Sequence, residues 1–165
     1  MVAGAPVERE VWRLLCEVPD PEIPILNVIE LGVVRYVRDE HERGIAVGVS
    51  PTYTGCPATE VIQASIKARL HEAGFESVRV DSVLAPPWTS DWLSDSAREK
   101  LREYGITPPA ESVENPRRLF GEPTVQCPRC SSAQTQRVSE FASTPCKALY
   151  RCTSCLEPFE YFKCI

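Results

Sequence analysis

Two Cys-x-x-Cys units near the C-terminal end constrain this chain more than any other feature. One runs from Cys127 to Cys130, the other from Cys152 to Cys155, and 21 residues separate them. Two thiols in one short turn can bind the same ion, and two such turns supply four sulfurs, the tetrahedral set that Zn²⁺ prefers. A unit of about 40 residues cannot build a sufficient core alone, so a bound metal would also stabilise its fold. The spacing predicts a zinc ribbon, with strands over 135–141 and 148–151 bringing the two turns together.

Other chemistry stays open for these thiols. A disulfide cluster needs no metal, but the first residues lack the pattern of a secretory signal, which favours a reducing cytoplasm and metal ligation. A rubredoxin-like iron or an iron–sulfur cluster also uses four cysteines. Cys146 and Cys164 have two interpretations, as small buried residues near the metal or as substitute ligands of a labile cluster. Neither His41, in a charged turn, nor His71, near a helix end, is expected to bind metal.

Charge and proline divide the 165 residues into unequal parts. Residues 1–116 carry 11 basic and 19 acidic side chains (net −8), whereas residues 117–165 carry 7 and 4 (net +3). Several prolines between 107 and 123 block both helix and central strand, and they predict an extended connector. The predicted domains are therefore an α+β body over 1–106, a proline-rich linker over 107–123 and a zinc ribbon over 124–165.

Apolar periodicity predicts the architecture of the α+β body. Helical spacing of apolar residues, with caps and glycine stops, predicts three helices, over residues 7–18, 58–73 and 94–105. The second of these is expected to carry Val61, Ile62, Ile66 and Leu70 on one face. Short β-branched or alternating runs predict three strands, over residues 32–37, 44–49 and 78–83. This order predicts a small α+β sandwich, with helices on one face of a three-stranded sheet.

Cys56 stands where the second predicted helix begins. Pro57 fits the first helical position, so Cys56 falls near the N-cap, where the positive end of the helix stabilises a thiolate. Gly55 permits a sharp turn and the close approach of a ligand. Two interpretations stay open, a reactive or metal-binding thiol and a buried structural one. Cys16, inside the first predicted helix, is expected to be structural.

The segment from Asp20 to Pro24, with sequence DPEIP, also has two interpretations. Alone it is a rigid acidic turn that follows a helix. If the fold brings it to the start of the second helix, Asp20 and Glu22 become oxygen ligands or proton acceptors beside Cys56. The residues do not decide between these interpretations.

These motifs together resemble a known family. The segments 20–24, 27–34 and 54–57 are similar to the signature of the small domain in iron–sulfur assembly factors. Joined to the run from Ser143 to Cys164, that domain resembles the family that forms the D component of bacterial 1,2-phenylacetyl-CoA epoxidase systems.

The resemblance implies a non-catalytic accessory subunit. The systems concerned add one oxygen atom from O₂ to the ring of phenylacetyl-CoA, and the implied partners are a diiron oxygenase and an iron–sulfur flavin reductase. The resemblance also implies that Cys56 is the key cysteine and that Asp20, Glu22 and Thr54 surround it. The implied role is to mature or deliver iron or a transient iron–sulfur cluster.

Motifs and charge in the sequence also bear on other possible functions. The sequence holds no pair of Glu-x-x-His motifs for a diiron site and no Gly-x-Gly-x-x-Gly loop, so this chain is not expected to be the oxygenase. Alternatives are a general iron–sulfur assembly or targeting factor and a nucleic-acid-binding ribbon module, which the net −8 body disfavours. An enzyme with Cys56 as nucleophile is poorly supported, because only two histidines exist. No apolar run approaches the ~18 residues of a membrane span, so no membrane partner is expected, and a homodimer stays open.

Overall fold

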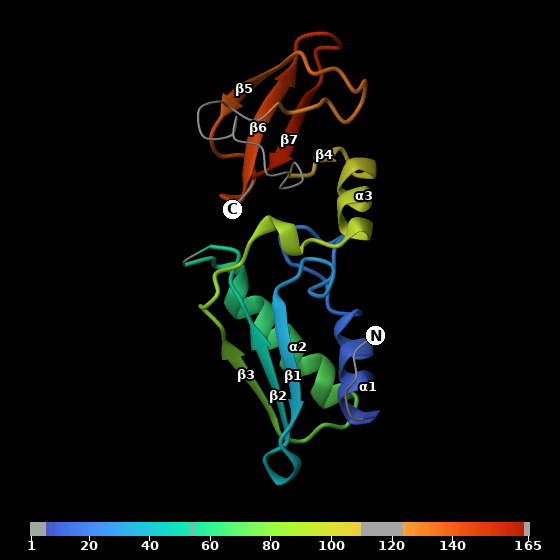
Figure 1. Cartoon of the computed structure of the whole chain (residues 1–165), viewed down its shortest axis with the longest axis vertical. Coiled ribbons are helices and arrows are strands. Elements are labelled where there is room, and N and C mark those ends of the chain that lie inside the picture. Colours follow the sequence, from blue (N-terminus) through green and yellow to red (C-terminus); the bar gives the residue numbers. More distant parts are fainter. Residues whose placement is uncertain (1–5, 54, 110–123, 164–165) are drawn as a thin grey trace. The chain divides into compact units, whose positions relative to one another are not determined.

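A computed structural model describes residues 6–53, 55–109 and 124–163 (Figure 1). Contacts divide the chain into a first unit, Met1–Trp88, and a second unit, Thr89–Ile165. The first combines helices with a small sheet and the second is mostly β, which confirms the predicted fold class. The predicted boundaries at 106 and 123 stay a prediction, and residues 110–123 of the linker lie outside the described residues. Among the described residues, no helix is both long and apolar enough to cross a membrane.

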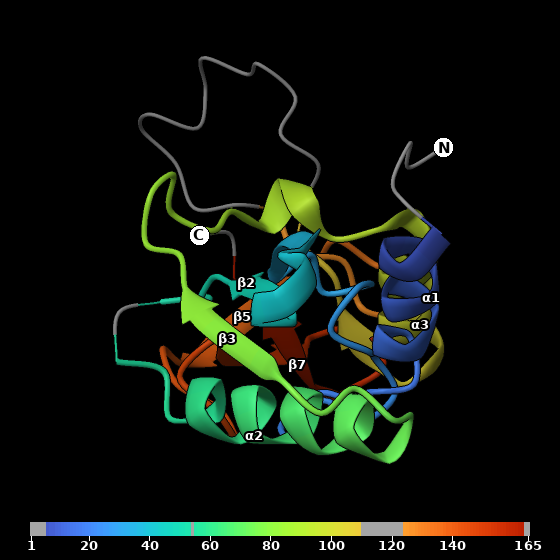
Figure 2. The same cartoon turned by 90° about the horizontal axis from the view of Figure 1, so that it is seen from below.

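The first unit is a three-stranded sheet packed by two helices. Its elements are α1 (Pro6–Leu15), β1 (Val34–Asp39), η1 (His41–Arg43), β2 (Ile45–Val49), α2 (Ala58–Glu72) and β3 (Val78–Ser82). Strand β2 lies between β1, which is antiparallel to it, and β3, which is parallel. The crossover helix α2 packs against β3, and α1 packs against β1 and α2 (Figure 2). The predicted strands over 32–37, 44–49 and 78–83 and the predicted helix over 58–73 are confirmed as elements.

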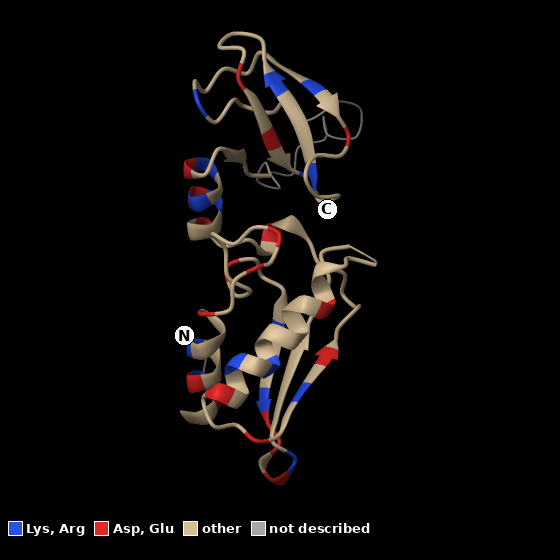
Figure 3. Ribbon diagram, turned by 180° about the vertical axis from the view of Figure 1, so that it is seen from behind, with Lys and Arg blue, Asp and Glu red and all other residues tan. Residues whose placement is uncertain are grey.

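Burial in this unit follows the residue pattern. Every residue of β2 is buried and none is charged, whereas β1 and β3 carry charges (Figure 3). Helix α2 buries one stripe at four-residue spacing, made of Ala58, Ile62, Ile66 and Leu70. Val61 was predicted on this face, but it is 50% exposed because it lies one residue, or about 100°, from that stripe. The first helix also ends three residues earlier than predicted, at Leu15.

The second unit contains the third helix and a four-stranded sheet. Its elements are η2 (Ser90–Trp92), α3 (Asp95–Glu103), β4 (Ile106–Thr107), β5 (Thr135–Ser139), β6 (Lys147–Cys152) and β7 (Pro158–Phe162), with strand order β4-β7-β6-β5. The Ser94 hydroxyl caps α3 by accepting the N–H of Ala97 at 3.0 Å. Helix α3 packs against β4, so it groups with this unit, whereas α1 and α2 pack on the first sheet. Strands β4 and β7 were not predicted.

Candidate functional site

Two similarly built turns of the second unit carry the four predicted metal ligands. The N–H of Cys127 donates to the carbonyl of Ser132 at 2.9 Å, and the N–H of Cys152 donates to that of Glu157 at 2.9 Å. In both turns the bond spans five residues and encloses the Cys-x-x-Cys unit. Repetition of one backbone pattern explains how each turn aims two sulfurs at one point.

Contacts between the side chains of the two turns hold the turns together. Arg129 forms an ion pair with Glu157 at 2.6 Å, and the hydroxyls of Ser132 and Ser154 lie 2.9 Å apart. The N–H of Thr153 donates to the carbonyl of Gln134 at 2.8 Å. The relative position of the turns therefore does not depend on the cysteines alone.

The geometry of the four sulfurs suits a single metal ion. The Sγ atoms of Cys127, Cys130, Cys152 and Cys155 all lie within 4.8 Å of one another. Between the turns, the sulfurs of Cys127 and Cys155 are 3.7 Å apart and those of Cys130 and Cys152 are 3.6 Å apart. A tetrahedral ion with Zn–S bonds of about 2.3 Å would separate its sulfurs by about 3.8 Å. The grouping predicted from sequence is confirmed, and its spacing fits Zn²⁺.

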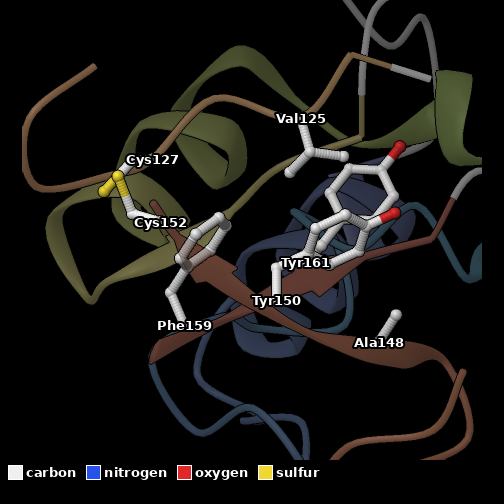
Figure 4. Close-up of a cluster of buried hydrophobic side chains, with 7 residues drawn as sticks. All are labelled: Val125, Cys127, Ala148, Tyr150, Cys152, Phe159 and Tyr161. Atoms are coloured by element: carbon white, nitrogen blue, oxygen red, sulfur yellow. The ribbon is translucent and has the colours of Figure 1, made fainter. Parts of the chain in front are cut away.

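Each turn buries its first cysteine and exposes its second. Cys127 is 1% exposed and Cys152 is 0% exposed, whereas Cys130 and Cys155 are exposed. The two buried cysteines belong to the hydrophobic core of this unit, in the cluster drawn in Figure 4, whose other members are Val125, Ala148, Tyr150, Phe159 and Tyr161. A metal bound here would therefore connect the core to the surface.

The thiols influence one another electrostatically. The N–H of Cys155 donates to the sulfur of Cys152 at 3.4 Å, and this bond lowers the pKa of the Cys152 thiol to about 6. At Cys130 the backbone N–H of Ser132 acts to lower the pKa, but the neighbouring thiols outweigh it and raise the pKa to about 12. Four thiolates at this spacing need a cation to offset their charge, because like charges this close repel one another.

Cys146 does not join this group of the described residues. Cys146 is buried directly before β6, and its sulfur lies 3.0 Å from the hydroxyl of Thr144. Cys152 is the last residue of that strand, so at about 3.3 Å per residue Cys146 lies about 20 Å from it. Cys164 lies outside the described residues. Cys16 follows α1 and is exposed, with its thiol donating to the carbonyl of Trp12 at 3.4 Å.

Cys56 lies in the loop between β2 and α2. Pro57 is the N-cap of α2 rather than its first helical residue, so Cys56 precedes the cap by one position. The carbonyl of Cys56 accepts the N–H of Thr59 at 3.2 Å, and the side chain is partly exposed. Gly55 has a φ of +81°, the left-handed conformation that glycine adopts readily. Cys56 is thus not enclosed in the core, and Thr54 lies outside the described residues.

Ser50 ties three segments together at one end of the sheet. Its N–H donates to the carbonyl of Val33 at 2.8 Å, and its hydroxyl donates to the carbonyl of Val83 at 2.7 Å. The loop that enters β1, the loop that leaves β2 and the segment that leaves β3 therefore meet here. The acidic turn belongs to the first of these loops and Cys56 to the second, so the fold brings both segments to the same end of the sheet. The residue pattern gave no signal for Ser50, because its partners lie far away in the sequence.

Asp20 shapes the acidic turn. Its side chain is 4% exposed, and its Oδ1 accepts the N–H of Glu22 at 2.9 Å and of Ile23 at 2.7 Å. Glu22 is partly exposed. Asp20 therefore stabilises its own turn by accepting two backbone N–H groups. The predicted roles of Asp20, Glu22 and Thr54 beside Cys56 stay a prediction.

Replacing Asp20 separates its structural role from its charge. Asp20→Ala removes the acceptor of two backbone N–H groups, and we expect a loss of about 1–3 kcal/mol in unfolding free energy. Asp20→Asn keeps the oxygen, so its loss should be the smaller of the two. Urea unfolding at pH 7 measures both. Equal losses in the two variants would contradict the role of Oδ1 in the turn.

Two family descriptions match this chain. Residues 8–82 match the family described as iron–sulfur cluster assembly protein, and residues 111–163 match the family described as PaaD zinc beta ribbon domain. A solved structure, a domain of unknown function from Bacillus anthracis, is similar with a TM-score of 0.53 and 26% identity, covering 57% of this chain and 90% of that one.

One known relative extends the likeness over both units, and another matches a smaller part of the chain. The chain is 51% identical over 160 residues to a protein of Escherichia coli (strain K12) that is provisionally named as the D component of 1,2-phenylacetyl-CoA epoxidase, covering 97% of this chain and 94% of that protein. It is 30% identical over 95 residues to the Fe-S protein maturation auxiliary factor of Porphyromonas gingivalis (strain ATCC BAA-308 / W83), covering 57% of this chain and 90% of that protein. The chain therefore belongs to the PaaD family, that of the D component of 1,2-phenylacetyl-CoA epoxidase.

Proposed function

We propose that this chain is a non-catalytic accessory subunit of a cytoplasmic phenylacetyl-CoA epoxidase system. Its role is to mature or deliver iron or an iron–sulfur cluster to the diiron oxygenase or to its iron–sulfur flavin reductase, and Cys56 is the transfer residue. The proposal is carried by one observation: a partly exposed cysteine precedes α2 in a domain that matches iron–sulfur assembly proteins. The likeness to the epoxidase component supplies the proposed system and clients.

The position of Cys56 suits the handover of a metal cargo. The N-terminal end of a helix favours negative charge, as a thiolate ligand carries. Partial exposure leaves a coordination position that a client can reach. In this proposal Glu22 acts as an oxygen ligand or proton acceptor, and Asp20 holds the turn that presents it.

The four-cysteine site has a separate role, which is to stabilise the ribbon. We propose that it holds Zn²⁺, because the sulfurs are spaced for one ion. In a four-iron cluster each cysteine binds a different iron atom, so the sulfurs would have to lie farther apart. When bound, zinc would supply structural cross-linking, and the ribbon would be the surface that docks the client.

The proposal is tested by Cys56→Ala and Cys56→Ser in cells that express the whole epoxidase system. We expect the iron content of the purified oxygenase or reductase, and the epoxidation of phenylacetyl-CoA, to fall by ~10-fold or more. Loss of a residue that only supports a metal ligand already costs about that much in metal affinity or activity. Cys16→Ala, at an exposed cysteine outside both sites, is the matched control.

Three outcomes separate the candidate functions. Unchanged client iron and epoxidation would contradict a transfer role for Cys56. A loss of iron from unrelated iron–sulfur enzymes as well would favour a general assembly factor over a dedicated epoxidase component. Loss of epoxidation with full client iron would place Cys56 in docking rather than transfer.

A further inference from the structure

Within the four-cysteine site, whose sulfurs all lie within 4.8 Å of one another, two contacts between the turns are shorter than 4 Å, and each joins one buried and one exposed residue. Buried Cys127 has its sulfur 3.7 Å from that of exposed Cys155, and buried Cys152 has its sulfur 3.6 Å from that of exposed Cys130. Both close pairs connect one turn with the other. An oxidant arriving from solvent therefore meets one member of each pair first.

We infer that this site is oxidised by hydroperoxides to two disulfides that cross between the turns, Cys127–Cys155 and Cys130–Cys152, with release of the metal. The inference rests on the proposed zinc occupancy. It assigns the site a second property besides structure, namely the reversible storage of four electrons in two dithiol pairs.

One hydroperoxide oxidises the two thiolates of each pair to a disulfide. The exposed thiolate attacks the peroxide oxygen, the O–O bond breaks, and a sulfenic acid and hydroxide form. The buried thiolate of the same pair then attacks the sulfenic sulfur, so the S–S bond forms and a second hydroxide leaves. Two thiolates lose two electrons and the peroxide gains them. After both pairs have reacted no thiolate remains, and Zn²⁺ leaves because it requires thiolate ligands.

The geometry favours bonds between the turns over bonds within them. Each close pair must shorten by about 1.6 Å to reach the ~2.05 Å of a disulfide. The ion pair of Arg129 with Glu157 and the contact of Ser132 with Ser154 keep the turns beside each other while the metal leaves. Disulfides between the turns preserve their connection, whereas bonds within each turn would leave the turns without a covalent link. The oxidised ribbon therefore keeps its fold, and thiol reductants restore the zinc site.

The test uses the full chain, purified without oxygen, after its zinc has been counted. Hydrogen peroxide is then added while a chromogenic chelator records released zinc, and free thiols are blocked before digestion with trypsin. Because Arg129 lies between Cys127 and Cys130, trypsin places these two cysteines on different peptides, whereas Cys152 and Cys155 share one. We expect one zinc per chain released, and both of the first two peptides joined to the third, with fragmentation showing the two proposed pairs.

Each alternative outcome has a defined meaning. Less than one zinc per chain before peroxide contradicts the proposed occupancy itself. Full zinc with Cys127 joined to Cys130, or zinc released with only sulfinic products, contradicts the inference and leaves the occupancy intact. In a second measurement the unaltered chain receives one peroxide per chain, and the first disulfide formed should be Cys127–Cys155 or Cys130–Cys152. A first disulfide between Cys130 and Cys155, between Cys127 and Cys152 or within one turn would also overturn the inference.

Discussion

Replacing Cys152 by serine is expected to unfold the ribbon and leave the first unit folded. Cys152 is 0% exposed, is the last residue of β6 and supplies one of the four sulfurs. Structural zinc contributes about 10–16 kcal/mol of apparent binding free energy in small zinc domains, and this becomes folding free energy. Losing a buried ligand removes most of it, and the aromatic cluster around Tyr150 is too small to compensate.

Amide hydrogen exchange measured along the chain tests this expectation. Protection in β5, β6 and β7 should be lost in Cys152→Ser, and zinc should fall from one per chain to near zero, while α2 and β2 keep their protection. Cys16→Ser, which changes an exposed cysteine outside the group, should change neither quantity. Retained protection of β6 without zinc would show that the ribbon folds on its hydrophobic contacts alone.

Short-range patterns predicted much of this molecule. The two-residue gap within each Cys-x-x-Cys unit and the helical spacing in α1 and α2 are properties of neighbouring residues, so they could be identified directly. The grouping of the four cysteines followed from the chemistry of one ion. The same local rules placed Val61 on the wrong face of α2, because two neighbouring apolar residues, Val61 and Ile62, left the direction of the stripe open.

Long-range contacts could not be predicted in this way. Strand β7 begins with Pro158 and carries the charged Glu160 among aromatic residues, and its partner Lys147 lies 13 residues away. The role of Ser50 depends on two segments that meet only in the fold. The residues that follow each Cys-x-x-Cys unit also gave no signal. Ser131 and Leu156 have φ values of 58° and 66°. Glycine is the residue that usually adopts this left-handed conformation, so a glycine at these positions would have indicated it in the sequence.

The two cysteine-containing regions differ in the property that decides their chemistry. The four-cysteine site offers a complete set of ligands to one ion, two of them in the core, so a bound metal is held by the fold. Cys56 stands in a partly exposed loop at the end of a sheet, where the coordination of a metal would have to be completed by another molecule or by nearby carboxylates. A closed site suits structure and an open one suits transfer.

Glu160→Gln is expected to destabilise the second unit, because it removes one partner of a largely buried ion pair. Lys147 is only 5% exposed, and its ammonium lies 2.8 Å from the carboxylate of Glu160, which is 25% exposed. Removing one partner of a buried pair costs about 3–5 kcal/mol, since it leaves the other charge uncompensated. Partial exposure of Glu160 reduces this, so we expect about 2–3 kcal/mol in urea unfolding at pH 7. Glutamine keeps an acceptor for the N–H of Ser143, which isolates the effect of charge.

A control and the pH dependence distinguish this ion pair from simple loss of a side chain. Glu140→Gln, which breaks the exposed pair with Arg137, should cost no more than about 1 kcal/mol. Burial is the largest single influence and acts to raise the pKa of Glu160, but the hydrogen bonds from Lys147 and Ser143 and the charge of Lys147 together outweigh it, so the pKa lies below its ordinary value. A lowered folded-state pKa stabilises the protein above the unfolded value of about 4.3, and that stabilisation disappears as the pH falls through the folded value. The difference between wild type and Glu160→Gln should therefore stay constant from about pH 7 to 5 and shrink only below about pH 4.3, while the zinc contribution common to both cancels. A difference that already shrinks between about pH 7 and 5 would mean that another group supplies the charge that Lys147 needs.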